Sequence, residues 1–458
     1  MALGWESLPE ALLDSILDNL VPIADCIRFS AVCRAWRCVA VENFRQIRRS
    51  SRYGRLQQQQ LPLLMLPSKN SRRQRRSLYS VTQTRVFDFQ LPVPYNVRFC
   101  GSSHGWLIVV DDAFKVTLFN PFSGEIISLP PIRRLAFEKR FREEISEIIS
   151  KGEEYERQLR EEYGEEVNIE EEEEEDDDDA EEEEEDVEEY MEEEEDGGED
   201  DVKEEAIEGR SEYSILKGVL SADPSVNPKE YVLMVIYGLE QRLAFIKPDD
   251  KEWTYLDGRT CCFEDHDKTD SPPPVSLLWH MTDIIFYKQR FYALYCMGQL
   301  LSCHIDTSTG FKVKKITPQD GLGPTFGKAY LVESLEGGDI LRVLRRYGKN
   351  KMTTGFKIYR LADGYGDPEW TEVKSLGDFA LFLGENHSIS VSASDYPGCE
   401  PNSIYFCGDH IRCSHRRRKD PYDIGVFNLE NGRVVESYTL GAIQWSMPPP
   451  IWILPTFM

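Results

Sequence analysis

The chain of 458 residues lacks the short patterns that many catalytic and metal sites require. It has no His-Glu-x-x-His motif of metalloproteases, and no Cys-x-x-Cys pair of the common zinc templates. A glycine-rich stretch at 321–328 has the wrong spacing for a phosphate-binding loop, and Ala329 stands where a Ser or Thr must meet magnesium. We therefore predict no catalytic residue, no cofactor and no bound metal in this chain.

Long apolar runs are also missing. No uninterrupted apolar stretch reaches the roughly 18 residues that a membrane-spanning helix needs. The N-terminus does not show the charged, apolar and small-residue succession of a signal peptide. We expect a soluble protein of the nucleus, the cytoplasm or both, without a membrane partner, whose 11 cysteines remain thiols.

Charge is distributed very unevenly along the chain. The formal net charge is −28, yet residues 161–208 contain 33 Asp or Glu and one Lys, so this segment alone carries −32. The other residues, 52 basic against 48 acidic, carry +4. A run of one charge sign with almost no apolar residues is typical of disorder. We predict a disordered acidic insert at 161–208 in an otherwise nearly neutral protein.

Three roles for the acidic insert stay open. It can attract basic proteins such as histones or ribosomal proteins, it can be a tolerated solvated loop, or it can screen a basic stretch of the same chain. That stretch, 45–86, has 11 Lys or Arg and no acidic residue, and we predict a basic linker there. Its cluster Arg72–Arg76 is either a nuclear-localisation signal or a solvated surface. Aromatic residues do not interleave the cluster, which argues against nucleic-acid binding.

The first 44 residues predict three short helices. Ser7 and Glu10 have the spacing of a capping box, and Pro9 falls in the first turn, where its missing N–H costs nothing. Apolar residues then recur at helical spacing, and Pro22 ends the first helix. About 40 residues are too few to bury all of these side chains. Part of this apolar surface must therefore meet a partner or another domain.

This helical unit resembles an F-box, and we assign the F-box to residues 4–44. The matching pattern is Leu8-Pro9-x-x-Leu12-Leu13-x-x-Ile16-Leu17, then Arg28-Phe29-x-x-Val32-Cys33-Arg34-x-Trp36-Arg37. In that family the three-helix motif binds the Skp-type adaptor of SCF cullin–RING ubiquitin ligases. The resemblance implies that Leu8 and Pro9 contact the adaptor. It implies that the interface or the motif core is completed by Leu12, Leu13, Ile16, Leu17, Val32, Cys33 and Trp36.

After residue 98 the sequence predicts antiparallel strands. Short runs rich in Val, Ile, Phe, Tyr and Leu alternate with turns that contain Gly, Asp, Asn or Pro. Five units share one layout, and their second hairpin turns centre near residues 122, 249, 308, 365 and 430. Such repeats are typical of a β-propeller, in which neighbouring units complete one another's core. Strands from 86–99 and 445–457 can close a sixth unit. The alternatives are a β-sandwich or two small β domains.

These patterns together predict a multidomain fold, α plus all-β. A three-helix F-box is followed by a β-propeller-like domain that the disordered acidic insert interrupts. The first part of the propeller spans 87–132 and the remainder spans 209–458. Helix-forming residues at 133–160 predict a charged helix that leads into the insert.

The combination of an F-box with this body also resembles a plant family. In that family the F-box is followed by a kelch-related propeller, an F-box-associated domain of unknown function. The matching stretches are 101–106, 118–124, 382–386, 390–394, 403–406 and 423–429. The resemblance implies a substrate-receptor role without naming the target.

Two hypotheses from different classes follow. The first is a non-catalytic substrate receptor of an SCF-type ubiquitin ligase, which binds the Skp-type adaptor, and through it the cullin–RING ligase, and presents an unknown target protein for ubiquitination. The alternative is a nuclear binding or chaperone-like protein whose acidic insert holds basic clients without ligase assembly. An enzymatic propeller has little support, since the one tight Cys/His cluster fits no common zinc template. That cluster is Cys407, His410, Cys413 and His415.

Overall fold

The computed structural model defines the part of the chain that is described below. The described residues are Trp5, Phe29 and the ranges 8–18, 32–48, 61–66, 75–81, 85–90, 97–111, 113–132, 215–238, 241–256, 262–263, 280–296, 298–306, 310–317, 328–335, 338–348, 352–362, 368–408, 423–437 and 450–455. The predicted charged helix at 133–160 and the predicted acidic insert at 161–208 lie outside them. The chain divides into two units, one of 1–135 with 210–458 and one of 136–209, and the described residues belong to the first.

Two α-helices are described near the N-terminus, α1 (Glu10–Asp18) and α3 (Arg34–Arg48). The predicted three-helix F-box is not confirmed, because the described residues contain only these two. α1 begins directly after Pro9, whose carbonyl oxygen accepts hydrogen bonds from the backbone N–H groups of Leu12 and Leu13 at 3.0 and 3.2 Å. Proline suits this position because its missing N–H would have no partner in the first turn.

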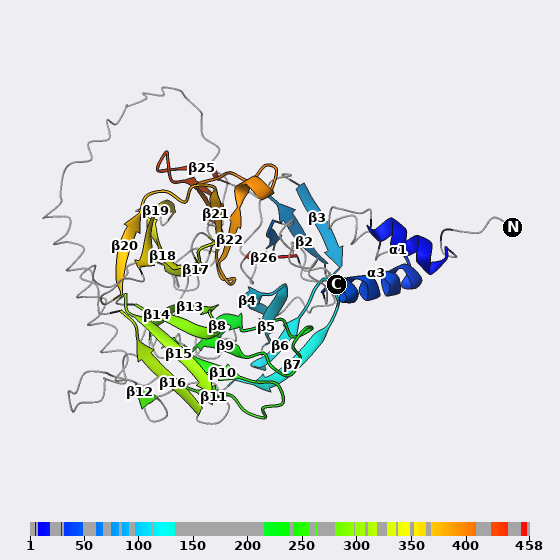
Figure 1. Ribbon diagram of the computed structural model, residues 1–458, viewed down its shortest axis with the longest axis horizontal. Coiled ribbons are helices and arrows are strands. Elements are labelled where there is room, and N and C mark those ends of the chain that lie inside the picture. The colour runs from blue at the N-terminus through cyan, green and yellow to red at the C-terminus, as the bar shows by residue number, and fades with distance from the viewer. Residues whose placement is uncertain are drawn as a thin grey trace, which may run out of the picture. The chain divides into compact units, whose positions relative to one another are not determined.

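The other regular structure is almost entirely β-sheet. Six sheets of four or five strands surround one centre, and they form a six-bladed β-propeller (Figure 1). The predicted propeller is therefore confirmed, and the alternatives of a sandwich or two small β domains are excluded.

The first three blades have four strands each. Blade 1 has the strand order β26 (Ile451–Ile453), β1 (Leu63–Leu66), β2 (Arg75–Ser80) and β3 (Arg85–Gln90). Blade 2 runs in chain order through β4 (Arg98–Ser103), β5 (Trp106–Val110), β6 (Lys115–Phe119) and β7 (Ile126–Pro131). Blade 3 does the same with β8 (Ile215–Leu220), β9 (Leu233–Tyr237), β10 (Arg242–Ile246) and β11 (Thr254–Tyr255).

Of the other three blades, blade 5 repeats this plan, whereas blades 4 and 6 have five strands. Blade 4 contains β13 (Met281–Tyr287), β14 (Arg290–Tyr295), β15 (Leu300–Asp306) and β16 (Gly310–Lys315), with β12 (Cys262–Phe263) parallel to β16. Blade 5 contains β17 (Lys328–Glu333), β18 (Ile340–Tyr347), β19 (Thr353–Ala362) and β20 (Glu369–Val373). Blade 6 has the order β22 (Ile389–Ser392), β21 (Phe379–Leu383), β23 (Ser403–Phe406), β24 (Gly425–Asn428) and β25 (Arg433–Ser437), with the 3-10 helix η4 (Ala393–Asp395) after β22.

Blade 1 closes the ring by pairing strands from opposite ends of the propeller. β26 is antiparallel to β1, with Leu64 opposite Trp452. The C-terminal strand and most of β3 come from the ranges expected for the sixth unit, whereas β1 and β2 precede those ranges and the strand at 98–103 belongs to blade 2. The range 45–86, predicted as a basic linker, thus contains β1, β2 and the start of β3. Its few apolar residues suffice because they are buried, Leu64, Leu66 and Leu78 among them.

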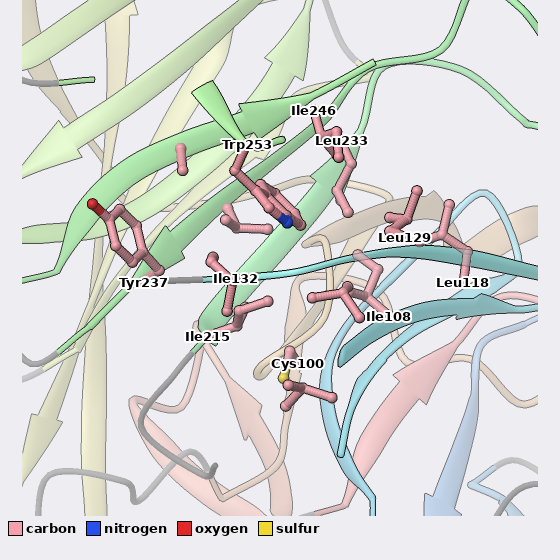
Figure 2. Packing of buried hydrophobic residues seen from close by; sticks show 14 of the residues in the cluster. Cys100, Ile108, Leu118, Leu129, Ile132, Ile215, Leu233, Tyr237, Ile246 and Trp253 are labelled. Atoms are coloured by element: carbon pink, nitrogen blue, oxygen red, sulfur yellow. The ribbon is translucent and has the colours of Figure 1, made fainter. Parts of the chain in front are cut away.

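Buried apolar side chains fill each space between neighbouring blades. Figure 2 shows the cluster between blades 2 and 3, in which Ile108 and Leu118 lie on one side and Leu233 and Trp253 on the other. A fully buried side chain of this size stabilises the fold by roughly 1.5–3 kcal/mol. Each of these clusters of described residues draws on two neighbouring blades, so a blade depends on its neighbours to bury its apolar side chains.

Tryptophan side chains add directed bonds between the same two blades. Trp106 Nε1 of blade 2 donates to Asp223 Oδ1 at 2.9 Å, and Trp253 Nε1 of blade 3 donates to the carbonyl oxygen of Pro130 at 2.9 Å. Buried indole N–H groups need such acceptors. These two bonds therefore fix the relative position of blades 2 and 3.

Candidate functional site

The helical head packs around side chains that the F-box pattern contains. Leu13 and Leu17 are buried together with Trp36 of α3, and the ring of Trp36 lies 4.6 Å from that of Phe29. Leu13 and Leu17 are four residues apart, so they lie on the same face of α1. The structure places these three predicted residues inside the head, where they position the helices and are shielded from a partner.

The other predicted residues lie at the surface of the head. Leu12 and Val32 are 53% and 51% exposed, Pro9 is exposed, and Leu8, Ile16 and Cys33 are partly buried against the core. Leu12 and Ile16 share a face of α1, displaced by one residue from the buried pair. Six of the nine predicted residues can therefore reach a partner.

Trp5 belongs with the exposed residues, although the F-box pattern did not single it out. Its side chain is 74% exposed, and its carbonyl oxygen accepts a hydrogen bond from Trp36 Nε1 at 3.1 Å. Eight large apolar side chains are exposed in the described part of the chain, and Trp5, Leu12 and Val32 are three of them. Three of the eight therefore lie within the first 32 residues of the chain. The sequence signal of Trp5 is a large aromatic residue just before the capping box.

One stretch of the propeller has the pattern of a hydrolase nucleophile. Residues 101–105 read Gly-Ser-Ser-His-Gly, a formal match to Gly-x-Ser-x-Gly. In hydrolases this serine stands at a strand-to-helix turn, whereas here the stretch forms the end of β4 and the tight turn into β5. Ser103 Oγ is buried and accepts a hydrogen bond from the backbone N–H of Leu220 at 3.2 Å. The serine thus connects blades 2 and 3 and does not occupy a nucleophile position.

The predicted Cys/His cluster falls mostly outside the described residues. Cys407 is buried at the end of β23, while His410, Cys413 and His415 are outside the described ranges. Within those ranges, no group of three or more His, Cys, Asp or Glu is arranged to hold a metal ion. None of the described helices is both long and apolar enough to cross a bilayer.

Comparison with known proteins gives the same two-part division. A family described as KIB1-4 beta-propeller matches residues 78–428, and an F-box-like family matches residues 5–50. The chain is 23% identical to F-box protein SKIP23 of Arabidopsis thaliana over 478 aligned residues, which cover 98% of this chain and 95% of that protein.

Two further Arabidopsis thaliana proteins extend the comparison. F-box protein At2g26160 is 23% identical over 434 residues, which cover 91% of this chain and 98% of the relative. F-box protein At4g35733 is 35% identical over 178 residues, which cover 37% of this chain and 46% of the relative. The resemblance to plant F-box proteins with a propeller is confirmed. The chain belongs to the KIB1-4 beta-propeller family and carries an F-box-like domain ahead of the propeller.

Proposed function

We propose that this chain is the substrate-receptor subunit of an SCF-type ubiquitin ligase. The F-box would bind a Skp-type adaptor and through it the cullin–RING ligase, and the propeller would bind the target protein. Ubiquitin transfer would occur on other subunits, so this chain would act by holding the target close to them. The observation that carries the proposal is the exposure of Trp5, Leu12 and Val32 on a helical head that matches the F-box-like family.

The exposed head residues can supply the affinity of such an interface. Burying one large apolar side chain contributes roughly 1.5–3 kcal/mol, and a few central residues usually dominate an interface. Leu13, Leu17 and Trp36 would contribute indirectly, because they hold α1 and α3 in position. The proposal therefore separates residues that touch the adaptor from residues that shape the head.

We also propose that the protein acts in the nucleus, the cytoplasm or both. Seven described cysteines are free thiols, and four of them, Cys100, Cys303, Cys399 and Cys407, are buried. Buried unpaired thiols are usual in reducing compartments. Fractionation of cells that express the tagged full chain tests this placement.

The adaptor proposal is tested with Leu12→Asp and Val32→Asp, singly and together. Each places a charge on an exposed apolar position, so the fold should persist while adaptor binding weakens, by about 100-fold or more in the double variant. Binding is measured by calorimetry and by co-purification with a plant Skp-type adaptor.

Matched controls come from exposed apolar residues of the propeller. Ile126 and Val226 are 57% and 47% exposed, so Ile126→Asp and Val226→Asp make the same chemical change far along the chain from the head. They should leave adaptor affinity unchanged. Full adaptor affinity in the Leu12→Asp, Val32→Asp double variant would refute the proposal.

A further inference from the structure

The propeller carries a group of charged and polar side chains near its centre. Neighbouring blades meet there through their innermost strands, β26 with β4, β4 with β8, β8 with β13, β13 with β17 and β17 with β22. Most side chains of these strands are apolar, but Arg98, Lys217 and Asp283 are only 3%, 1% and 0% exposed. The loop between β21 and β22 adds polar residues that are also buried. The central polar cluster is defined as Arg98, Lys217, Asp283, Glu385, Asn386, His387 and Ser388.

One ion pair and two hydrogen bonds tie this cluster to five blades. Lys217 of β8 forms an ion pair with Asp283 of β13, and Asp283 Oδ2 accepts a hydrogen bond from the backbone N–H of Leu331 at 2.6 Å. The backbone N–H of His387 donates to the carbonyl oxygen of Ser102 at 2.9 Å. Blades 2 to 6 therefore all contribute to one region.

Electrostatic interactions connect Arg98 to the same region. Burial raises the pKa of the Cys100 thiol to about 12, and the charges of Arg98 and Glu385 both act on that thiol. Burial lowers the pKa of Lys217, and the charges of Asp283, Lys328 and Glu385 act on it. Glu385 is thus within electrostatic reach of both Cys100 and Lys217, one on each side of the contact between β4 and β8.

Arg98 is a buried cation that forms no ion pair with any other residue of the described ranges. None of its three guanidinium nitrogens has a hydrogen-bond partner in the part of the chain that the structure describes. Another buried arginine, Arg345, shows the usual arrangement, since its guanidinium bonds to Thr353, Cys407 and Asp423. Burying a charge is costly unless it is paired or bound to a ligand. The described residues therefore do not supply the partner that the guanidinium of Arg98 needs.

Other members of the cluster also have unused hydrogen-bonding capacity. Asn386 Oδ1, His387 Nε2 and Ser388 Oγ are buried atoms without a hydrogen-bond partner. Burial, together with the charges of Lys217 and His104, lowers the pKa of His387 to about 3, so its ring is neutral at pH 7. A neutral imidazole and a hydroxyl can each donate one hydrogen bond.

The charges and the burial define the class of ligand. Within the cluster Arg98 and Lys217 are positive, and Asp283 and Glu385 are negative. Lys217 pairs with Asp283, whereas the guanidinium of Arg98 has no hydrogen-bond partner among the described residues. A guanidinium binds a carboxylate or a phosphate through two parallel hydrogen bonds. Because the cluster is buried, only a small molecule fits. We propose that the centre of the propeller binds a small oxyanion, a carboxylate or a phosphate, through Arg98.

The test measures the melting temperature of the purified full chain in a Tris-chloride buffer. Sodium phosphate and sodium succinate are titrated separately at constant ionic strength, with sodium chloride as the reference. An anion well above its Kd should raise the melting temperature of the wild type by about 2–4 °C, because it binds only the folded state. The two series distinguish a phosphate from a carboxylate ligand.

Arg98→Met is the decisive variant. It removes the unpaired charge, so it should melt above the wild type in chloride and lose the response to both anions. Arg98→Lys keeps the positive charge but loses the two parallel N–H donors of the guanidinium, so it should bind the anion about tenfold more weakly. This variant preserves the test if Arg98→Met does not fold. Arg290→Met, at an exposed position of β14, should respond as the wild type does.

Two results would overturn the proposal. Equal shifts in wild type and Arg98→Met would mean that the anions act elsewhere on the protein. A wild type that responds to neither anion, together with an Arg98→Met variant that melts below it, would assign Arg98 a purely structural role.

Discussion

Replacing Asp423 by alanine should destabilise the propeller by about 3–5 kcal/mol. Asp423 lies before β24 in blade 6, and its Oδ2 accepts hydrogen bonds from Arg345 Nη2 at 2.9 Å, Thr353 N at 2.9 Å and Thr353 Oγ1 at 2.6 Å. Arg345 and Thr353 belong to β18 and β19 of blade 5. One carboxylate oxygen therefore binds two blades together at a site where both charged side chains are almost fully buried.

The magnitude follows from what the substitution leaves behind. Arg345 keeps its bonds to the carbonyl oxygen of Cys407 at 2.8 Å and to Tyr330 Oη at 3.2 Å, but its charge loses its counter-ion. The backbone N–H of Thr353 loses its acceptor, and an unsatisfied buried donor costs about 1–3 kcal/mol. Removing one partner of a buried ion pair costs about 3–5 kcal/mol in total.

The assay is thermal and urea denaturation of the full chain, followed by circular dichroism. The expected loss corresponds to a melting temperature lower by roughly 6 °C or more. A second variant, Arg345→Met with Asp423→Ala, removes both charges and should lose at least about 1 kcal/mol less than the two single variants added together.

A surface pair of the same residue types provides the control. Arg360 Nε and Asp339 Oδ2 are 3.8 Å apart, and their side chains are 36% and 24% exposed. Solvent screens this pair, so Asp339→Ala should cost less than about 1 kcal/mol. If Asp423→Ala costs no more than Asp339→Ala, the buried carboxylate does not hold blades 5 and 6 together and the reasoning fails.

Three further outcomes are expected. Burial lowers the pKa of His387 to about 3 in the folded state, so below about pH 6.5 the unfolded chain takes up a proton that the folded chain does not. The free energy of unfolding should therefore fall from pH 6.5 toward pH 3, and it should fall less steeply in His387→Gln. The free energy of unfolding is measured by urea titration at several pH values. An equally steep fall of that free energy with falling pH in wild type and His387→Gln would contradict this. Iodoacetamide should modify the exposed Cys38 well before Cys100 and Cys303, whose pKa burial raises to about 12, as peptide mass spectrometry can check. Deleting residues 161–208 should leave adaptor affinity unchanged in calorimetry, whereas a large loss would favour the hypothesis that the insert holds the partners.

The sequence predicted the outer strands of the propeller better than the inner ones. Each of the five expected units corresponds to three strands of one blade, such as β5, β6 and β7 of blade 2. The innermost strands were missed because polar residues interrupt their apolar pattern, as Lys217 does in β8 and Asp283 in β13. Neighbouring blades bury those side chains, and the pattern of apolar and polar residues within one strand does not reveal such burial.

Close packing hides a second feature from the sequence. A Cβ atom at Gly101 of β4 would lie 2.5 Å from the carbonyl oxygen of Gly218 of β8. Two strands more than 100 residues apart thus meet backbone to backbone, and the position of Gly101 needs glycine. A Cβ atom at Gly218 would instead meet the side chain of Ile108, at 2.8 Å from its Cδ1. From the sequence alone a glycine favours a turn, although Gly101 and Gly218 lie within strands.

Family resemblance located the F-box-like segment but could not divide it into surface and core. Leu12 and Leu13 are adjacent and chemically identical, yet one is 53% exposed and the other 2%. The difference depends on where α3 packs against α1, which follows from tertiary contacts and not from the pattern. For the same reason, the exposed Trp5 was absent from the predicted residues.

Closure of blade 1 sets an order of events during synthesis. The helices of the head end at Arg48, whereas the strand that completes the ring begins at Ile451, about 400 residues later. At typical translation speeds of about 5–20 residues per second, the head leaves the ribosome roughly 20–80 s before the ring can close. Throughout that interval blade 1 lacks its innermost strand, β26, which contacts β4 of blade 2. An adaptor engaged early would therefore bind a receptor whose propeller is still open.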